Sequence, residues 1–212
     1  MAYDSNVFIN CPFDEEYQPL FRALVFAVYD CGFVPRCALE LDDGSEVRIE
    51  KIRRIIDQSR YGLHDISRTE PDGGSGLPRF NMPLELGLFL GAKLFGDERQ
   101  RVKACVIFDR DRYRYQAFCS DIAGQDIRAH HGDEREVVRG VRDALRTWLP
   151  GRTLPGAAEV FRRYRLFSDS LEELAARLWM DASELTFNDL AWLVTGWLEE
   201  NSPPAVRPAS AG

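Results

Sequence analysis

The first two thirds of the chain alternate short runs rich in β-branched and aromatic residues with longer runs of helical periodicity. This alternation is typical of βαβ units, in which the strands lie parallel and helices cover both faces of the sheet. The predicted strands are residues 6–10, 33–39, 60–67 and 102–109, with a weak fifth strand near residue 127. The predicted helices are 15–32, 42–59, 81–95 and 134–149. We therefore expect an α/β fold with a flavodoxin-like parallel sheet of about five strands.

Two of these helices carry signals at their ends. Gly32 is placed as the C-terminal stop of the first helix. Ser45 is a favourable N-cap for the second helix. Apolar residues of the second helix recur at helical spacing and predict a buried face; they are Val47, Ile49, Ile52, Ile55 and Ile56.

The last third of the chain differs in composition from the rest. Residues 150–157 are rich in Pro and Gly, which is typical of a linker. Two or three amphipathic helices are predicted after it, at about 157–167, 170–179 and 186–200. We expect an α/β domain at 1–150, a helical module at 157–200 and a disordered tail at 201–212, which is rich in Pro, Ala and Ser.

Side chains in the helical module suggest how its helices begin and pack. Ser170 with Glu173 fits a capping box, and Thr186 with Asp189 is a weaker version of the same pattern. Tryptophans are large apolar side chains that most often pack in a core. We expect a small helical core to be formed by Trp179, Trp192 and Trp197.

Composition narrows the classes of function. The net charge of −7 argues against nonspecific nucleic-acid binding, which needs a basic face. The cysteines number five, and no two have CxxC spacing, which indicates a reducing compartment and no zinc site. The N-terminus lacks the pattern of a signal peptide, and no apolar run approaches the roughly 20 residues of a membrane span. We therefore expect a cytoplasmic protein that has no membrane partner.

Polar side chains follow the first and third predicted strands. In a flavodoxin-like sheet, the ligand crevice lies beyond the carboxyl ends of these two strands. The loop 68–80 would overhang this crevice, and the helix predicted from Asn81 begins directly after it. The side chains expected to converge there are Asn10, Asp65, Ser67, Asn81 and Glu85.

Glu85 is unusual because its helix is apolar on every side. A helix of this kind is expected to be buried, and a buried carboxylate needs partners or a function. Gly87 and Gly91 would permit a neighbouring backbone or a ligand to approach closely. The alternative interpretation is structural, since a glutamate in the first turn stabilises a helix through the helix dipole.

Other candidates have weaker patterns. His64 lies inside a strand and should point away from Asp65, so a core or surface position is favoured over a catalytic one. His130 and His131 are interpreted as loop residues without ligand spacing around them. The run RDRYRYQ (110–116) could stack on a nucleotide base, although a solvated loop is favoured. Arg48 and Arg79 are candidates to meet a pyrophosphate.

Three segments carry a resemblance to a known group of proteins. NVFINCPFDEEY, YGLHDIS and LPRFNMPLELGLFLGAK resemble the superfamily of nucleoside 2-deoxyribosyltransferases and Toll/interleukin-1 receptor (TIR)-like domains, and more narrowly bacterial TIR-like proteins. The resemblance covers roughly residues 5–110. It implies a flavodoxin-like fold, in which a glutamate after the third strand attacks or stabilises the anomeric carbon of a ribose. The chain departs from the transferases in having FNMPLELG where they usually carry Asp-Gly before the glutamate motif.

Residue roles follow from the resemblance. Glu85 matches the catalytic glutamate, and Asp65 with Ser67 matches the pair that holds sugar hydroxyls or orients the glutamate. Asn81 and Arg79 are the further substrate-binding candidates of the loop and helix start, and Phe8 with Asn10 would line the base or nicotinamide pocket.

These roles predict an N-glycosidase that hydrolyses NAD or a related nucleotide. Nicotinamide leaves as a neutral base from a cationic ring, so the reaction needs no strong general acid. NAD is then a substrate and no cofactor is expected. The resemblance also implies a homo-oligomer and a role in defence or stress.

Two alternatives remain open. One is a module that binds a nucleotide signal or a partner without catalysis, with Glu85 as a capping residue. The other is a nucleoside deoxyribosyltransferase or nucleotide hydrolase, for which Asp65 is the candidate proton donor.

Overall fold

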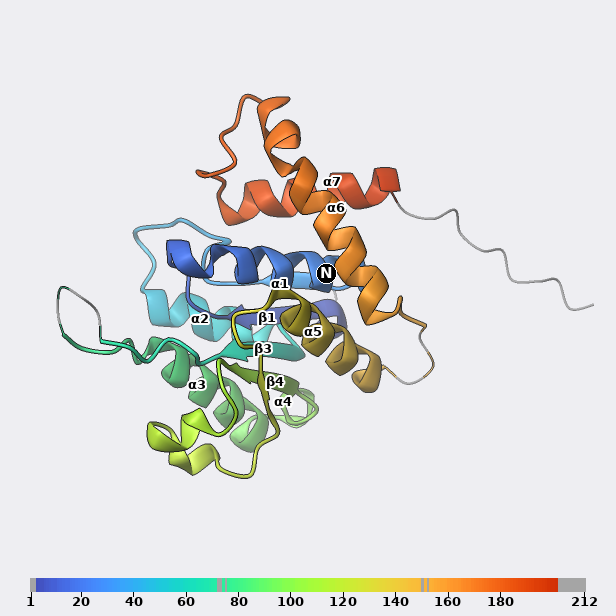
Figure 1. Cartoon of the computed structure of the whole chain (residues 1–212). Helices are drawn as coiled ribbons and strands as arrows, with labels where there is room; N and C mark the ends of the chain where they lie inside the picture. The colour runs from blue at the N-terminus through green and yellow to red at the C-terminus, as the bar shows by residue number, and fades with distance from the viewer. Residues whose placement is uncertain (1–2, 72–73, 75, 150, 152, 202–212) are drawn as a thin grey trace, which may run out of the picture.

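The computed structural model describes residues 3–71, 74, 76–149, 151 and 153–201, and it has the expected α/β architecture (Figure 1). Within these residues, five parallel strands form one sheet in the order β2-β1-β3-β4-β5. The strands are β1 Asn6–Asn10, β2 Val34–Arg36, β3 Tyr61–Asp65, β4 Ala104–Asp109 and β5 Ile127–Ala129. This is the flavodoxin-like order, in which β1 and β3 are neighbours and their carboxyl ends flank the switch point.

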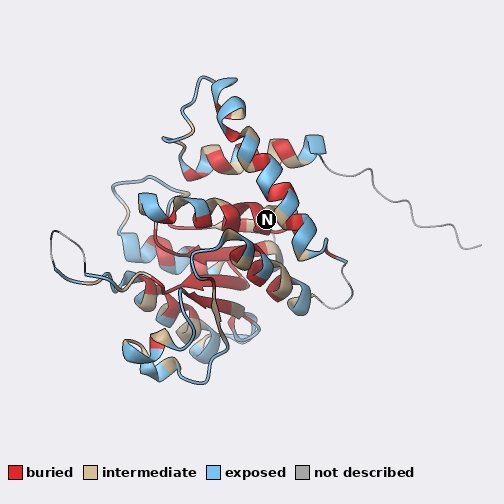
Figure 2. Cartoon of the chain, in the orientation of Figure 1, coloured by how far each residue is buried: buried red, intermediate tan, exposed pale blue. Residues whose placement is uncertain are grey.

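Helices cover both faces of the sheet (Figure 1). They are α1 Gln18–Asp30, α2 Arg48–Asp57, α3 Asn81–Phe95, the short α4 Glu98–Arg101, α5 Glu134–Trp148, α6 Ala157–Ala176 and α7 Phe187–Asn201. Val7 and Ile9 of β1 belong to the core shared with α1 and α5, whereas Phe8 belongs to the core shared with α2 and α3. Strands β1 and β3 are buried along their whole length (Figure 2). Burial on both faces is typical of parallel strands, and here it includes the polar residues Asn10, His64 and Asp65 at the strand ends.

Two glycines allow helices to approach the sheet closely. A Cβ atom on Gly62 of β3 would lie 2.9 Å from the Phe89 ring of α3. A Cβ atom on Gly140 of α5 would lie 2.5 Å from the Phe108 ring of β4. Real Cβ atoms do not approach other atoms so closely, so both helix–sheet contacts depend on the missing side chain.

The end of α1 follows the predicted signal. Gly32 has φ 79°, and its backbone N–H donates to Tyr29 O at 2.8 Å. The next N–H, of Phe33, donates to Val28 O at 3.1 Å. This pair of bonds is the Schellman arrangement, which glycine permits without strain. Gly32 is therefore confirmed as the helix stop.

The start of α2 differs from the prediction. The helix begins at Arg48, its N-cap is Val47, and no side chain caps it. Ser45 instead donates from both N and Oγ to Asp43 Oδ1, at 2.9 and 2.6 Å. This local turn competes with the helix and moves its start towards the C-terminus. Val47 and Ile49 are consequently exposed, and only Ile52, Ile55 and Ile56 of the predicted stripe are buried.

Helix α3 has the predicted bounds but not the predicted burial. Its buried residues are Met82, Glu85, Leu86 and Phe89. Leu84, Leu94 and Phe95 are exposed. A Cβ atom on Gly87 or Gly91 would meet nothing within 4 Å. The expected close approach of a neighbouring backbone at these glycines is therefore wrong for the described residues.

The C-terminal helices pack directly on the α/β layers (Figure 1). Phe26 of α1 meets Phe167 of α6 and Trp197 of α7, with ring centroids 5.4 and 5.7 Å apart. Arg163 of α6 donates to Asp30 Oδ1 of α1 at 2.9 Å. The same helices thus share one apolar core with the sheet-covering helices α1 and α5.

Helix α6 continues through the predicted break at residues 168–169. Ser170 does not cap a new helix, because its Oγ donates to Phe167 O at 2.9 Å inside a continuous one. The helix continues because Phe167 and Leu171, four residues apart, are both buried on the same face. The capping box at α7 is confirmed: Thr186 N donates to Asp189 Oδ2 at 3.0 Å, and Asp189 N donates to Thr186 Oγ1 at 3.2 Å.

The three tryptophans of the helical module do not form the predicted core together. Trp197 is buried, whereas Trp179 is 96% exposed and Trp192 is 60% exposed. Only Trp197 lies on the face that meets α1 and α6. The predicted tail from residue 202 lies outside the described residues, as do residues 150 and 152 of the predicted linker. Of the helices in the described ranges, none has the combination of length and hydropathy that crossing a bilayer requires.

Candidate functional site

The carboxyl ends of β1 and β3 hold the first part of the predicted site. Asn10 ends β1 and is buried; its Nδ2 donates to Met82 O in the first turn of α3 at 2.9 Å. The same Nδ2 lies 3.1 Å from His64 Nδ1. Asn10 therefore ties the end of a strand to the start of the helix that carries Glu85.

His64 is a core residue, in agreement with the favoured interpretation. Its ring is fully buried and lies edge-on to Phe89, with centroids 4.9 Å apart. Burial, and to a smaller extent the charge of Lys103, lower the pKa of His64 to about 3. The imidazole is therefore neutral at physiological pH, and Nδ1 can accept the hydrogen bond from Asn10.

Asp65 lies at the centre of a closed polar network. Its Oδ2 accepts from the Tyr17 hydroxyl at 2.5 Å, and its Oδ1 accepts from Ser67 N at 2.8 Å. His130 Nε2 approaches Oδ2 to 3.1 Å, at an ion-pair distance. Burial alone would raise the pKa of Asp65, but the contacts from His130, Ser67 and Tyr17 outweigh it and lower the pKa below 3.8. Asp65 is therefore an ionised anchor and a poor proton donor at neutral pH.

The surroundings of Glu85 shift its pKa in the opposite direction from that of Asp65. It is 4% exposed in the second turn of α3, and no hydrogen bond or ion pair to its carboxylate is found among the described residues. Burial raises its pKa to about 7, and the charge of Arg48 opposes this shift only in part. A buried carboxylate without a partner favours either a proton or an external cation.

The charges of Asp65 and Glu85 both affect the thiol of Cys11, the residue after β1. Cys11 follows Asn10 and is 2% exposed. Burial raises the pKa of its thiol, and the charges of Asp65 and Glu85 both raise it further. Both carboxylates thus lie within electrostatic reach of the thiol that follows β1.

Of the remaining predicted site residues, one lies beside Asp65 and three lie elsewhere. Ser67 is buried beside Asp65, and its carbonyl oxygen accepts a hydrogen bond from Arg114. Phe8 is fully buried in the core between β1, α2 and α3. Asn81 and Arg79 are exposed at the start of α3 and in the loop before it. The structure therefore brings together Asn10, Asp65, Ser67 and Glu85, and leaves Phe8, Asn81 and Arg79 outside this group.

Three residues of this edge were not predicted. Tyr17 and His130 both contact Asp65 from distant parts of the chain. Arg114 joins the ends of β3 and β4, since Nε donates to Asp109 Oδ1 at 3.0 Å and one terminal nitrogen donates to Thr69 Oγ1 at 2.5 Å. A signal existed for His130, because it directly follows a predicted strand whose carboxyl end lies at the same edge of the sheet.

A cavity of about 420 Å³ opens between α1, the segment after β2 and the start of α7. Its lining includes Arg48, Lys51 and Ala38 on one side and Phe187 and Asn188 on the other. Asn188 Nδ2 donates across to Glu40 O at 3.2 Å. Arg48 lines this cavity, and its positive charge lowers the pKa of Glu85. Glu85 itself does not line the cavity.

The described side chains offer no metal site: no group of three or more His, Cys, Asp or Glu residues among them is placed to hold an ion. In comparisons with known proteins, no family model matches the chain, and a search of curated proteins finds no significant match.

Proposed function

We propose that this chain is an N-glycosidase that hydrolyses NAD or a related nucleotide at the ribosyl bond, with Glu85 as the catalytic carboxylate. The observation that carries the proposal is the environment of Glu85: a buried carboxylate without a hydrogen-bond partner among the described residues, whose pKa is raised to about 7. It lies beside the switch point of a flavodoxin-like sheet, where ligands of this fold class bind.

The chemistry suits a carboxylate of this kind. Cleavage of an N-glycosidic bond passes through an oxocarbenium-like state, in which positive charge develops at the anomeric carbon. A desolvated carboxylate stabilises that charge far more than a solvated one does. The cationic nicotinamide ring of bound NAD would also lower the pKa of Glu85, so that the carboxylate ionises as substrate binds. The C–N bond breaks and its electron pair leaves with neutral nicotinamide. Water then adds to the same carbon and gives up its proton to Glu85 or to solvent, which yields the free ribose hydroxyl.

The cavity of about 420 Å³ supports a place for the rest of the substrate. Arg48 lines it at the start of α2, where the helix has no side-chain cap and its backbone N–H groups favour an anion. We assign the pyrophosphate to Arg48 and the ribose to the side of the cavity nearest Glu85. Asp65 would hold the site in shape through Tyr17, Ser67 and His130. Asn10 would hold the start of α3.

The test is nicotinamide release from NAD by the purified chain over a series of protein concentrations. Glu85→Gln should lower the rate about 100-fold or more, while Glu172→Gln, a change at an exposed position of α6, should leave it unchanged. The value of kcat/KM should rise with pH up to about 7, the pKa of Glu85 in the free protein, because only the ionised form stabilises the cation. Full activity of Glu85→Gln would disprove the proposal. A rise in specific activity with concentration would support assembly into a homo-oligomer.

Two other functions remain as competing proposals. Binding of a nucleotide without catalysis is favoured by the fact that Glu85 does not line the cavity beside Arg48. It predicts saturable NAD binding without turnover. A nucleoside deoxyribosyltransferase is less well supported, because it needs a proton donor to the base and the pKa of Asp65 is lowered. A cytoplasmic location is proposed from the cysteine pattern, and a role in defence or stress from the resemblance.

A further inference from the structure

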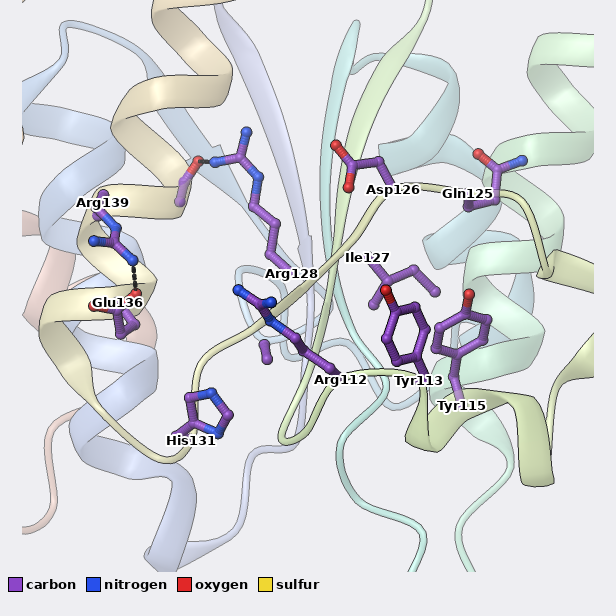
Figure 3. A pocket seen from close by; sticks show the side chains of 12 residues that line it. Arg112, Tyr113, Tyr115, Gln125, Asp126, Ile127, Arg128, His131, Glu136 and Arg139 are labelled. Carbon is purple, nitrogen blue, oxygen red and sulfur yellow. Dashed lines mark hydrogen bonds and ion pairs between the residues drawn. The ribbon is translucent and has the colours of Figure 1, made fainter.

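A larger cavity, of about 730 Å³, lies at the opposite side of the sheet from β2 (Figure 3). Its walls are the segment after β4, the edge strand β5 and the first turns of α5. None of Asn10, Asp65 or Glu85 lines it. The cavity is therefore separate from the site proposed above, and its volume is in the range of small-molecule sites, roughly 300–1,000 Å³.

The polar lining of this cavity is dominated by arginine. The guanidinium groups come from Arg112, Arg128 and Arg139, on three different elements (Figure 3). Arg128 is fixed by a hydrogen bond to Gly140 O at 2.8 Å, and Arg139 pairs with Glu136. Arg112 is exposed, and no described side chain pairs with it. Three guanidinium groups line one cavity of a chain whose net charge is −7, and Arg112 is the one without a partner among the described residues, which makes it the first candidate for a phosphate, whose oxygens match the planar donor fork.

Two residues of the same lining have unusual backbone conformations. Tyr113 has φ 63° and His131 has φ 54°, both in the left-handed region. Side chains other than glycine occupy this region at a cost, and such residues cluster at binding sites. In the described residues, only Trp179 joins them as a third non-glycine residue with positive φ. Tyr113 is 70% exposed, so its backbone strain presents an aromatic face to solvent beside Arg112.

We propose that this cavity is a second ligand site, which binds a phosphorylated nucleotide. The phosphates contact Arg112 together with Arg128 and Arg139, and the base stacks on Tyr113. Tyr115 is buried and supports the floor, where it packs with Ile107 of β4. The site takes a free nucleotide rather than a nucleic-acid strand, because the acidic side chains Asp126 and Glu136 also line it and the chain as a whole is acidic.

The experiment is calorimetric titration of the full chain with each of the four nucleoside 5′-diphosphates (ADP, GDP, CDP and UDP), and with inorganic phosphate and adenosine. At least one diphosphate should bind, and more tightly than phosphate or adenosine. Arg112→Ala should weaken that binding about 10-fold or more. Arg53→Ala removes an exposed arginine of α2 that pairs with Glu50, and it should leave binding unchanged. Absence of binding by all four diphosphates would overturn the proposal.

A further pair of variants separates the two cavities. Arg48→Ala should leave intact the component of diphosphate binding that Arg112→Ala weakens, if that ligand lies in the cavity beside β5. Binding lost with Arg48→Ala but kept with Arg112→Ala would place the nucleotide beside α2 and overturn the proposal. A single-stranded oligonucleotide of eight residues that bound at least 10-fold more tightly than every diphosphate would also overturn it.

Tyr113→Gly tests the role of the aromatic ring. Glycine adopts positive φ without strain, so this variant should fold and should melt at an unchanged or higher temperature. Diphosphate affinity should nevertheless fall about fivefold or more, since base–aromatic stacking is lost. Unchanged affinity in a folded Tyr113→Gly protein would remove Tyr113 from the proposed site.

Discussion

Asp65 and Glu85 are carboxylates at the same edge of the sheet, but their surroundings have opposite effects. Asp65 has contacts from a tyrosine hydroxyl, a backbone N–H and a histidine, and its pKa is lowered. Glu85 has none of these, and its pKa is raised to about 7. Pairs of acids whose environments push their pKa values apart are typical of catalytic centres. The difference teaches that contacts within the protein stabilise the ionised form of Asp65, whereas the charge of Arg48 only partly offsets the effect of burial on Glu85, which in the proposed function is completed by the positive charge of the substrate.

The largest expected effect on stability is at Asp65. Asp65→Ala leaves the Tyr17 hydroxyl, the Ser67 N–H and the buried His130 without their partner, and should lower the free energy of unfolding by about 3–5 kcal/mol. Because the pKa of Asp65 is lowered in the folded state, its contribution is present above the usual value of 3.8 and is lost on acidification. Urea denaturation at pH 7 and at about pH 2.5 measures this, and the difference between wild type and variant should shrink at the lower pH, which lies below the usual pKa of 3.8. A loss below about 1 kcal/mol at pH 7 would show that the network contributes little.

The next largest effect is at Glu85, where the substitution should raise rather than lower the free energy of unfolding. The folded-state pKa is about 7 and the ordinary value is 4.5, so the folded protein holds this proton more tightly than the unfolded chain. Stability therefore falls as pH rises from the ordinary value through the folded pKa. Glu85→Gln removes the ionisable group and should stabilise the protein by up to about 3 kcal/mol at pH 8, relative to its effect at pH 4.5.

Urea denaturation of wild type and Glu85→Gln at both pH values gives this difference directly. His64 also makes stability depend on pH, since its pKa is lowered to about 3, but it is present in both proteins and its effect cancels. Glu172→Gln should show no such difference between the two pH values. An equal effect of Glu85→Gln at pH 4.5 and 8 would mean that the pKa of Glu85 is not raised.

The smallest expected effect is on the stability of α3 and does not involve the carboxylate of Glu85. A Cβ atom on Gly87 meets nothing within 4 Å, so Gly87→Ala should stabilise α3 by about 0.5–1 kcal/mol. The pH dependence of stability should stay as in wild type, because the surroundings of Glu85 are unchanged. Thermal melting at pH 6 and pH 8 measures both points. A destabilised Gly87→Ala protein would show that the open space at this helix face is filled in solution.

The sequence predicts the framework of the site well. Alternating strand and helix runs are a local signal, and they place Asn10, Asp65 and Glu85 at one edge through the topology of parallel sheets. Burial of Glu85 also follows, because it lies one turn before Phe89 on the side of α3 that faces the sheet. The element bounds fail mainly where side chains compete with a helix end, as Asp43 does with Ser45.

The side chains that contact Asp65 could not be predicted from local sequence signals. Tyr17 and His130 lie 48 and 65 positions from Asp65, and only the packed structure decides that they meet. The apolar sequence of α3 predicts burial, but it does not show which sides have neighbours, and Leu84 and Phe95 face solvent. The run 110–116 is predicted to be a solvated loop, with stacking on a base as the alternative; Arg112 and Tyr113 are exposed, whereas Arg114 joins β3 to β4, which the sequence does not show.

The contrast among the tryptophans has a spectroscopic consequence. Trp197 is buried against Phe26 and Phe167, so its fluorescence should be blue-shifted and should respond when α7 leaves α1. Trp179 and Trp192 are exposed and emit from water whether or not these helices are docked. Trp148, which stacks on Tyr61, is the other sheltered tryptophan. Because the start of α7 also forms a wall of the cavity beside Arg48, the emission of Trp197 in a Trp148→Phe protein reports on whether that wall is in place. The chain thus carries its own optical probe of the cavity in which we place the substrate.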